Sequence, residues 1–192
     1  MSRREQIKMD DAEVAAFLKE ERTVTCASVG PRGWPHLMPL WYVPREAPAD
    51  GSAPPTPPPV PPAPPALPTP PVSPTPPGPR IWAWTYGASQ KVVNLERDPR
   101  VTLQVEAAEE YQELRGVMLE CEVVIHRELE LVAELGAEIL LRNSVPRGVK
   151  PPAELPKEVR EVVTAQAVKR VGLEFVERRR STWDHRKLGG LY

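Results

Sequence analysis

A proline-rich stretch divides this chain of 192 residues into two parts. Sixteen of its 26 prolines lie between Gly51 and Arg80, where large apolar residues are scarce. Proline has no backbone N–H to donate, and a segment with few apolar side chains cannot offset the entropy that it loses on ordering. We therefore predict that residues 46–80 form an extended, disordered insertion of polyproline type. Residues 1–45 and 81–192 are expected to fold together as a single domain.

The residues before the insertion show the pattern of one amphipathic helix and a β-hairpin. Apolar residues at helical spacing behind an aspartate cap predict a helix over 11–21. Small and β-branched residues predict a strand over 23–29, and a Gly-Pro-Arg-Gly turn leads into a second strand over 35–43. Pro35 and Pro39 lie in that second strand, which indicates an edge strand, or a strand whose unpaired side faces a ligand.

The residues after the insertion alternate between strands and short helices. Antiparallel strands in this number leave exposed edges unless the sheet closes on itself, so a barrel suits the pattern best. The predicted fold class is mainly β with small helices (α+β), arranged as a closed or split β-barrel. Strands are predicted over 81–86, 100–107, 114–126 and 168–180, and helices over 89–97, 128–142 and 157–167.

The passage from strand 81–86 to the following helix suggests a phosphate site. The N–H groups at the start of a helix have no helical partners, and the helix dipole is positive there. The hydroxyl of Ser89 and the ammonium of Lys91 would complete a socket for a phosphate. On local sequence alone, a helix cap and a solvated lysine explain the two residues equally well.

Composition and charge exclude several classes of function. The formal net charge of -1 gives no basic field for nucleic acid, and no apolar run approaches the roughly 20 residues of a membrane-spanning helix. Cys26 and Cys121 each lie in an apolar strand, which indicates free thiols in a cytoplasmic protein. Three scattered histidines predict no metal site. No Ser-His-Asp or Cys-His pairing at a recognisable spacing appears, so no catalytic residue is assigned.

Taken in order, these segments resemble the pyridoxamine 5′-phosphate oxidase-like superfamily, whose fold is an FMN-binding-like split β-barrel. The resemblance covers nearly the whole chain outside the insertion, and it is strongest to the branch that uses the deazaflavin coenzyme F420. It implies an oxidoreductase that transfers hydride to or from a small unsaturated organic substrate. Coenzyme F420 is the first choice of cofactor and FMN the alternative, at the interface of a homodimer. The matching segments are 23–29, 33–41, 84–91, 94–101, 111–117 and 183–187.

The resemblance also implies which residues bind the cofactor. The second strand would lie along the ring system, the turn into the helix would hold the phosphate, and the C-terminal segment would close over the site, across the dimer. Gln90 departs from the Ser-Arg-Lys turn of the oxidases, and Gly116 stands where they place a ring-contacting glutamine, which argues against oxidation of pyridoxamine phosphate. The implied cofactor-binding residues are Met38, Pro39, Leu40, Trp41, Trp84, Thr85, Ser89, Gln90, Lys91, Trp183 and Arg186, and the substrate-side candidates are His36 and His185.

Two other functions stay open at this point. The same barrel would serve a carrier or sensor that binds flavin, F420 or haem without turnover. The protein could also be an adaptor, with a proline-rich insertion that binds SH3-like or WW-like modules. The Pro-x-x-Pro segments of the insertion, however, lack a basic flank. For single residues, Trp41 either packs in the core or contacts the ring, and His36 is either structural or a proton donor to the substrate.

Overall fold

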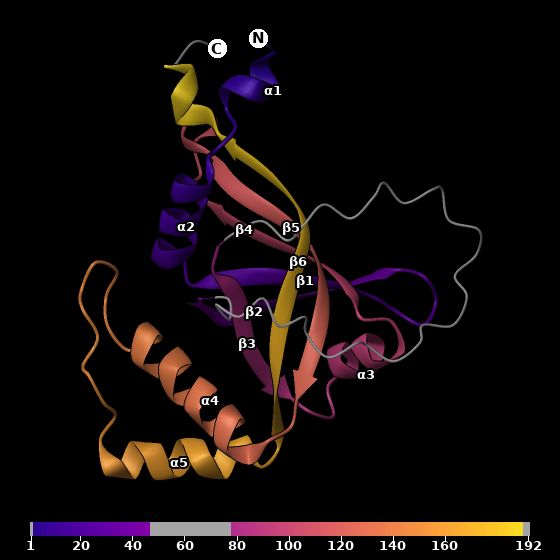
Figure 1. Cartoon of the computed structure of the whole chain (residues 1–192), viewed down its shortest axis with the longest axis vertical. Coiled ribbons are helices and arrows are strands. Elements are labelled where there is room, and N and C mark those ends of the chain that lie inside the picture. Colours follow the sequence, from indigo (N-terminus) through magenta and orange to yellow (C-terminus); the bar gives the residue numbers. More distant parts are fainter. Residues whose placement is uncertain (1, 47–77, 190–192) are drawn as a thin grey trace.

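The computed structural model describes residues 2–46 and 78–189. Within them, six antiparallel strands close into one barrel in the order β1-β2-β3-β6-β5-β4, which confirms the predicted fold class. The long strands β5 and β6 run side by side along the long axis of the molecule (Figure 1). The strands are β1 (Thr23–Val29), β2 (Pro35–Arg45), β3 (Arg80–Tyr86), β4 (Arg100–Ala107), β5 (Arg115–His126) and β6 (Arg170–Asp184).

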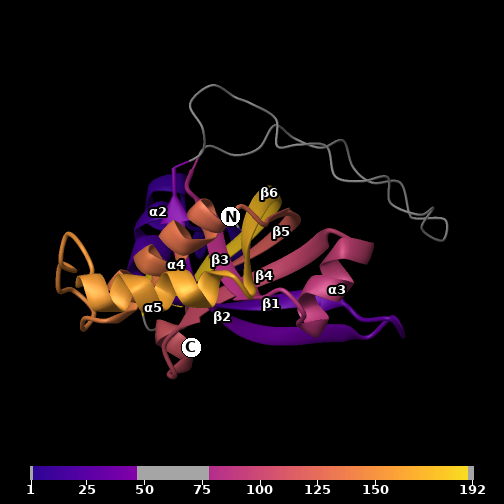
Figure 2. The same cartoon turned by 90° about the horizontal axis from the view of Figure 1, so that it is seen from below.

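Short helices surround the barrel. Figures 1 and 2 show α2, α4 and α5 on one side of it and α3 on the opposite side. The elements predicted from the sequence are all present, and only β6 extends clearly further than expected, to Asp184. Most of the predicted insertion, residues 47–77, lies outside the described residues. The helices are α1 (Arg3–Gln6), α2 (Asp11–Glu20), α3 (Gln90–Arg97), α4 (Leu129–Asn143) and α5 (Lys157–Ala167), with 3-10 turns η1 (Tyr111–Glu113) and η2 (His185–Leu188).

Helix α2 starts where the sequence predicts. The Asp10 carboxylate accepts a hydrogen bond from the backbone N–H of Glu13 at 2.8 Å, and the Glu13 carboxylate accepts one from the N–H of Asp10 at 2.8 Å. This reciprocal capping box pairs two N–H groups that the helix itself cannot satisfy. Val14, Phe17 and Leu18 then face the barrel and are buried in the main core.

Strand β2 changes its partner part-way along. Its whole first half, residues 35–41, pairs with β1, whereas residues 42–45 pair with β3. Among the described strands, residues 35–41 therefore have a neighbour on one side only. Pro35 and Pro39 both lie in this half, where a missing N–H disrupts no second ladder. The predicted edge is confirmed, and it splits the barrel between the first half of β2 and the end of β3.

Arg142 of α4 ties that helix to the end of α2. Its Nη2 donates to the backbone oxygens of Leu18, Lys19 and Glu21 at 2.9, 2.9 and 2.5 Å. These carbonyls belong to the last turn of α2 and its exit, where helical partners run out. The guanidinium also lies 5.4 Å from the ring centroid of Tyr42, a buried residue of β2. One side chain thus connects α2, α4 and the barrel.

We predict that Arg142→Met, which keeps much of the side-chain volume, lowers the free energy of unfolding by about 2–4 kcal/mol, because several backbone oxygens lose a charged donor. Urea denaturation followed by circular dichroism measures the change. The matched control is Arg160→Met on α5, where the arginine is exposed and lies 3.4 Å from Glu154. An effect of equal size in both variants would contradict the capping role of Arg142.

The ends of β2 and β3 are adjacent, because Arg45 pairs with Arg80 in the ladder. Replacing residues 46–79 by Asn-Gly should join the strands through a two-residue hairpin turn. We expect the variant to fold cooperatively and to be more stable by up to about 2 kcal/mol, since a shorter loop loses less entropy on closure. Urea denaturation measures this. A variant that no longer unfolds cooperatively would show that the barrel needs the removed residues.

Candidate functional site

Helix α3 begins at Ser89 with an unused hydroxyl. The backbone N–H of Ser89 donates to the backbone oxygen of Tyr86 at 3.0 Å. This hydrogen bond closes the turn that leads out of β3. Ser89 then occupies the N-cap position, yet its side chain makes no capping hydrogen bond. Its Oγ is buried and has no partner among the described residues. A serine hydroxyl in this position can both donate and accept, so it is available to a ligand at the helix N-terminus.

Lys91 lies two residues further, in the first turn of α3, and its ammonium is inside the barrel rather than in solvent. Its Nζ donates to Oγ1 of Thr85 at 2.9 Å, and both residues are buried. Burial lowers the pKa of Lys91. The nearby Cys26 raises this pKa, but only enough to offset part of the effect of burial. Burial in turn raises the pKa of the Cys26 thiol to about 11. Among the described residues no carboxylate pairs with Lys91, so its positive charge is uncompensated beneath the start of α3.

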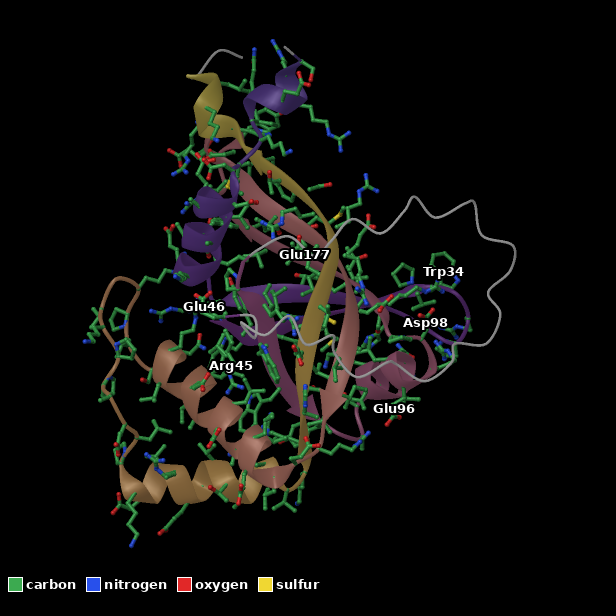
Figure 3. All side chains as sticks on the ribbon, in the orientation of Figure 1. Trp34, Arg45, Glu46, Glu96, Asp98 and Glu177 are labelled. Atoms are coloured by element: carbon green, nitrogen blue, oxygen red, sulfur yellow. The ribbon has the colours of Figure 1, made fainter. Side chains whose placement is uncertain are left out.

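A cavity of about 370 Å³ lies between the β1–β2 turn and α3. It brings His36 and Gln90, both predicted from the sequence, next to Trp34 and Asn94. Nδ1 of His36 is buried and has no partner in the described part of the chain. Figure 3 shows Trp34 near the tip of the hairpin, on the side of the barrel that carries α3. The cavity therefore offers an imidazole, an amide and an aromatic ring to one ligand.

Asn94 was not predicted as a site residue. It is fully buried, donates from Nδ2 to Oγ of Ser28 at 3.2 Å and accepts from Nε2 of Gln90 at 2.9 Å. The contact with Gln90 follows from the spacing of four residues on one helix, which could have indicated it. The contact with Ser28 links α3 to β1 and has no signal in the local sequence.

The unpaired half of β2 is apolar and exposed. Leu37, Met38 and Trp41 are 57%, 43% and 53% exposed, Pro39 is exposed, and Leu40 is half-buried. Tyr86, at the end of β3, is also 56% exposed. Apolar residues gathered in this way usually mark a surface that a ligand or another protein covers. The predicted ring-binding segment is therefore accessible along its length.

The resemblance implies that Trp84 and Thr85 both touch the phosphate or ribityl side of the cofactor, but their side chains lie on opposite faces of β3. Thr85 faces the barrel interior with Lys91, whereas Trp84 faces outward and packs on α4. A Cβ on Gly136 of α4 would lie 2.4 Å from Cζ3 of Trp84, so only glycine allows this approach. Through their side chains, Trp84 and Thr85 cannot contact the same side of one ligand.

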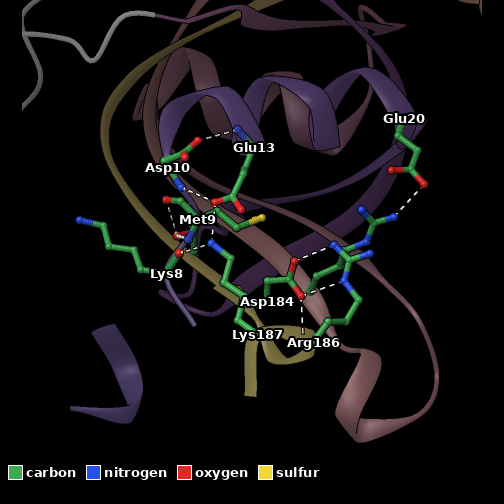
Figure 4. Close-up of polar contacts among 10 residues, drawn as sticks. Lys8, Met9, Asp10, Glu13, Glu20, Asp184, Arg186 and Lys187 are labelled. Carbon is green, nitrogen blue, oxygen red and sulfur yellow. Dashed lines mark hydrogen bonds and ion pairs between the residues drawn. The ribbon is translucent and has the colours of Figure 1, made fainter. Parts of the chain in front are cut away.

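The C-terminal candidates Trp183, His185 and Arg186 lie at the far end of the barrel from α3 (Figure 1). Figure 4 shows Arg186 bound to Asp184, with Nε and Nη2 donating at 2.9 and 2.6 Å. These hydrogen bonds lower the pKa of Asp184. Nδ1 of His185 lies 2.9 Å from the backbone oxygen of Tyr111. Within one chain this segment is therefore not brought together with Ser89.

Gly116 and Trp183 face each other across β5 and β6. A Cβ on Gly116 would lie 2.3 Å from Cζ2 of Trp183 and 2.9 Å from the Val105 oxygen. The indole thus covers the position at which the oxidases were expected to carry a glutamine. A larger residue at position 116 would require the tryptophan to move.

Comparison with known proteins adds one relative at substantial identity. No family model and no curated protein matches the chain. The crystal structure of the conserved hypothetical protein Rv2991 from Mycobacterium tuberculosis is 32% identical, with a TM-score of 0.71, and the match covers 100% of this chain and 95% of that one. The chain belongs to the same family.

Other solved structures share the barrel at lower identity. An F420 reductase is 15% identical with a TM-score of 0.51, over 86% of this chain and 94% of its own. A putative pyridoxamine 5′-phosphate oxidase from Listeria innocua is 10% identical with a TM-score of 0.51, over 90% and 96%. HutZ, the haem storage protein from Vibrio cholerae, is 13% identical with a TM-score of 0.54, over 91% and 93%.

The chain has the split β-barrel fold of these solved structures. The resemblance predicted from the sequence is thereby confirmed at the level of the fold. Among the described residues of this split-barrel protein, no helix is long and apolar enough to cross a membrane. In the same residues, no group of three or more histidine, cysteine or acidic side chains could hold a metal ion.

The buried Lys91 is predicted to lower stability. Replacing both members of its hydrogen bond by apolar side chains of similar shape, in Thr85→Val with Lys91→Met, should give a split-barrel protein at least as stable as the wild type at pH 7. Lys91→Met alone leaves the Thr85 hydroxyl unpaired and should be about 1–3 kcal/mol less stable than the double variant. Urea denaturation of the three proteins makes the comparison.

The difference in stability between the double variant and the wild type should depend on pH. Because the pKa of Lys91 is lowered by folding, the folded protein releases this proton before the unfolded chain does. The destabilisation is complete below the folded pKa of Lys91 and decreases as the pH rises from there toward the ordinary lysine value of about 10.4. The advantage of the double variant over the wild type should therefore decrease between pH 7 and pH 10. A constant advantage would show that Lys91 titrates normally.

Proposed function

We propose that this protein binds a phosphorylated flavin-type cofactor, coenzyme F420 in the first place and FMN as the alternative, and uses it to transfer hydride to or from a small unsaturated organic molecule. The observation that carries the proposal is the unpartnered, buried Oγ of Ser89 at the start of α3. Buried polar atoms without a hydrogen bond are uncommon in folded proteins, and they are often completed by a ligand.

The surroundings of Ser89 suit a phosphate. The first N–H groups of α3 have no helical acceptor, and the helix dipole is positive there. The Lys91 ammonium adds a charge that no described carboxylate neutralises. Because Lys91 already donates to Thr85, it would attract the anion over a distance or exchange that neutral partner for it. Ser89 and the backbone would make the direct contacts.

The ring system would lie on the first half of β2. Residues 35–41 have backbone groups without a second strand, and the apolar side chain of Met38 is exposed beside them. A flat aromatic ring with a polar edge can use both kinds of group. The same surface would be covered further by a second copy of the chain, and we propose a homodimer with its site at that interface.

The bound cofactor would supply the hydride chemistry, and the protein would supply position, exclusion of water and a proton. His36 is suited to the proton step, because its Nδ1 is buried without a partner and the residue lines the cavity next to Gln90. Trp183, His185 and Arg186 of one chain lie at the other end of its barrel. They would reach a site only in the partner subunit.

We predict that Ser89→Ala binds F420 or FMN about tenfold more weakly than the wild type, because a hydrogen bond to a charged phosphate is lost. Its free energy of unfolding should be no lower than that of the wild type, since Oγ makes no hydrogen bond in the free protein. Titration of the purified protein with each cofactor, followed by absorbance and fluorescence, gives the affinities.

The matched control is Ser144→Ala, at the end of α4, where Oγ donates to the Leu141 oxygen. Its cofactor affinity should equal that of the wild type. Failure of both cofactors to bind below the millimolar range would refute the proposal. Tight binding without hydride transfer to a panel of unsaturated acceptors would instead support the carrier, which has the same barrel but no turnover.

A further inference from the structure

A second cavity, of about 260 Å³, lies outside the barrel where β2 and β3 stop pairing. Its walls come from five elements: Trp41 of β2, Trp84 of β3, helices α4 and α5, and Arg170 at the start of β6. Ile139, Val162 and Val163 supply the aliphatic part of the walls. Helices α4 and α5 pack along this side of the barrel in Figures 1 and 2. The cavity is therefore apolar apart from two side chains, Arg170 and Gln166.

Arg170 is held between two aromatic rings. Its guanidinium carbon lies 4.2 Å from the ring centroid of Trp84 and 4.3 Å from that of Tyr86. These rings project from the same face of β3, two residues and roughly 7 Å apart, so a guanidinium at stacking distance from both lies between them. With an aromatic ring on each side of it, the group can accept a further polar partner only through its N–H donors, at the edge of the guanidinium.

That edge is almost unused. In the described residues the single hydrogen bond of Arg170 is a long one of 3.4 Å from Nη2 to Oε1 of Gln166, and Nε is buried without a partner. No carboxylate forms an ion pair with Arg170 within the described ranges, and no acidic residue lines the cavity. A half-buried arginine in such surroundings ordinarily has an anionic partner, since an uncompensated charge is costly.

We propose that this cavity binds a small molecule that joins an apolar body to one carboxylate. The carboxylate would accept hydrogen bonds from the edge of the Arg170 guanidinium in the two-point geometry that arginine favours. The apolar body would lie between Trp41, Trp84 and the valines of α5. The volume of about 260 Å³ is below the roughly 300–1,000 Å³ of drug-sized sites, which limits the ligand to about one ring with a short side chain.

Benzoate is the probe, and benzamide is its neutral counterpart of the same shape. Titration of the full chain, without added cofactor, is followed by the indole N–H signals in nuclear magnetic resonance spectra. These are assigned by single Trp→Phe variants of the five tryptophans. Benzoate should shift the signals of Trp41 and Trp84 in a saturable manner and leave Trp34 and Trp183 unchanged. Benzamide should bind at least about tenfold more weakly, because it carries no charge.

Two variants test the role of the guanidinium. Arg170→Gln should weaken benzoate binding about tenfold or more. The matched control is Arg45→Gln, because Arg45 also stacks on a tryptophan, Trp82 at 4.9 Å, but is ion-paired with Glu138. Its benzoate affinity should equal that of the wild type. If Arg170→Gln fails to fold, Val162→Phe at the exposed rim of the cavity should block benzoate while Arg170 is intact.

Equal binding of benzoate and benzamide, equal shifts of all five indoles, or unchanged affinity in Arg170→Gln would each overturn the proposal. The test needs neither F420 nor FMN, and Ser89 is not part of this cavity. Failure of benzoate to bind therefore leaves the proposed cofactor site intact, and failure of the cofactor to bind leaves this one intact.

Discussion

The change of partner within β2 determines the rest of this structure. Residues 35–41 of β2 pair with β1, and residues 42–45 pair with β3. The strands β2 and β3 therefore separate at Trp41 and Trp84. The parting leaves half a strand with unused backbone groups and exposed apolar side chains. It also leaves an outer corner between β2 and β3 that α4 and α5 cover. Both candidate sites adjoin this one split in the barrel.

The alternation of side chains along β3 then separates the two sites. Successive residues of a strand point to opposite faces, so Thr85 reaches inward to Lys91 while Trp84 and Tyr86 point outward to Arg170. The helix that follows β3 starts at Gln90, with Ser89 at its N-cap and Lys91 in its first turn. A short stretch of sequence, residues 84–91, therefore contributes to a polar site on one side and to an apolar site with one cation on the other.

Local chemistry explains why so much of the fold could be predicted. The capping box at Asp10, the turn between β1 and β2 and the two prolines of β2 each act within a few residues, so their consequences are visible in the sequence. Contacts between distant residues are different. Nothing near Trp84 in the sequence indicates that Gly136 must be glycine or that Arg170 will stack on its ring. The alternation of a strand already places neighbours such as Trp84 and Thr85 on opposite faces, whereas the face that lies inside the barrel is set by distant contacts.

The distribution of unsatisfied polar atoms points to the same region. Six buried side-chain nitrogen or oxygen atoms in the described residues have no hydrogen-bond partner. In Arg80, Arg142 and Arg178 the atom is Nε, and the terminal nitrogens of each side chain bind a carboxylate or backbone oxygens at 3.0 Å or less. His36, Ser89 and Arg170 have no such compensation, apart from the long contact of Arg170 with Gln166. All three lie beside the split between β2 and β3 or on the helix that follows it. Since leaving such groups unpaired costs roughly 1–3 kcal/mol each, their concentration here is the pattern expected of a surface shaped for ligands rather than for stability.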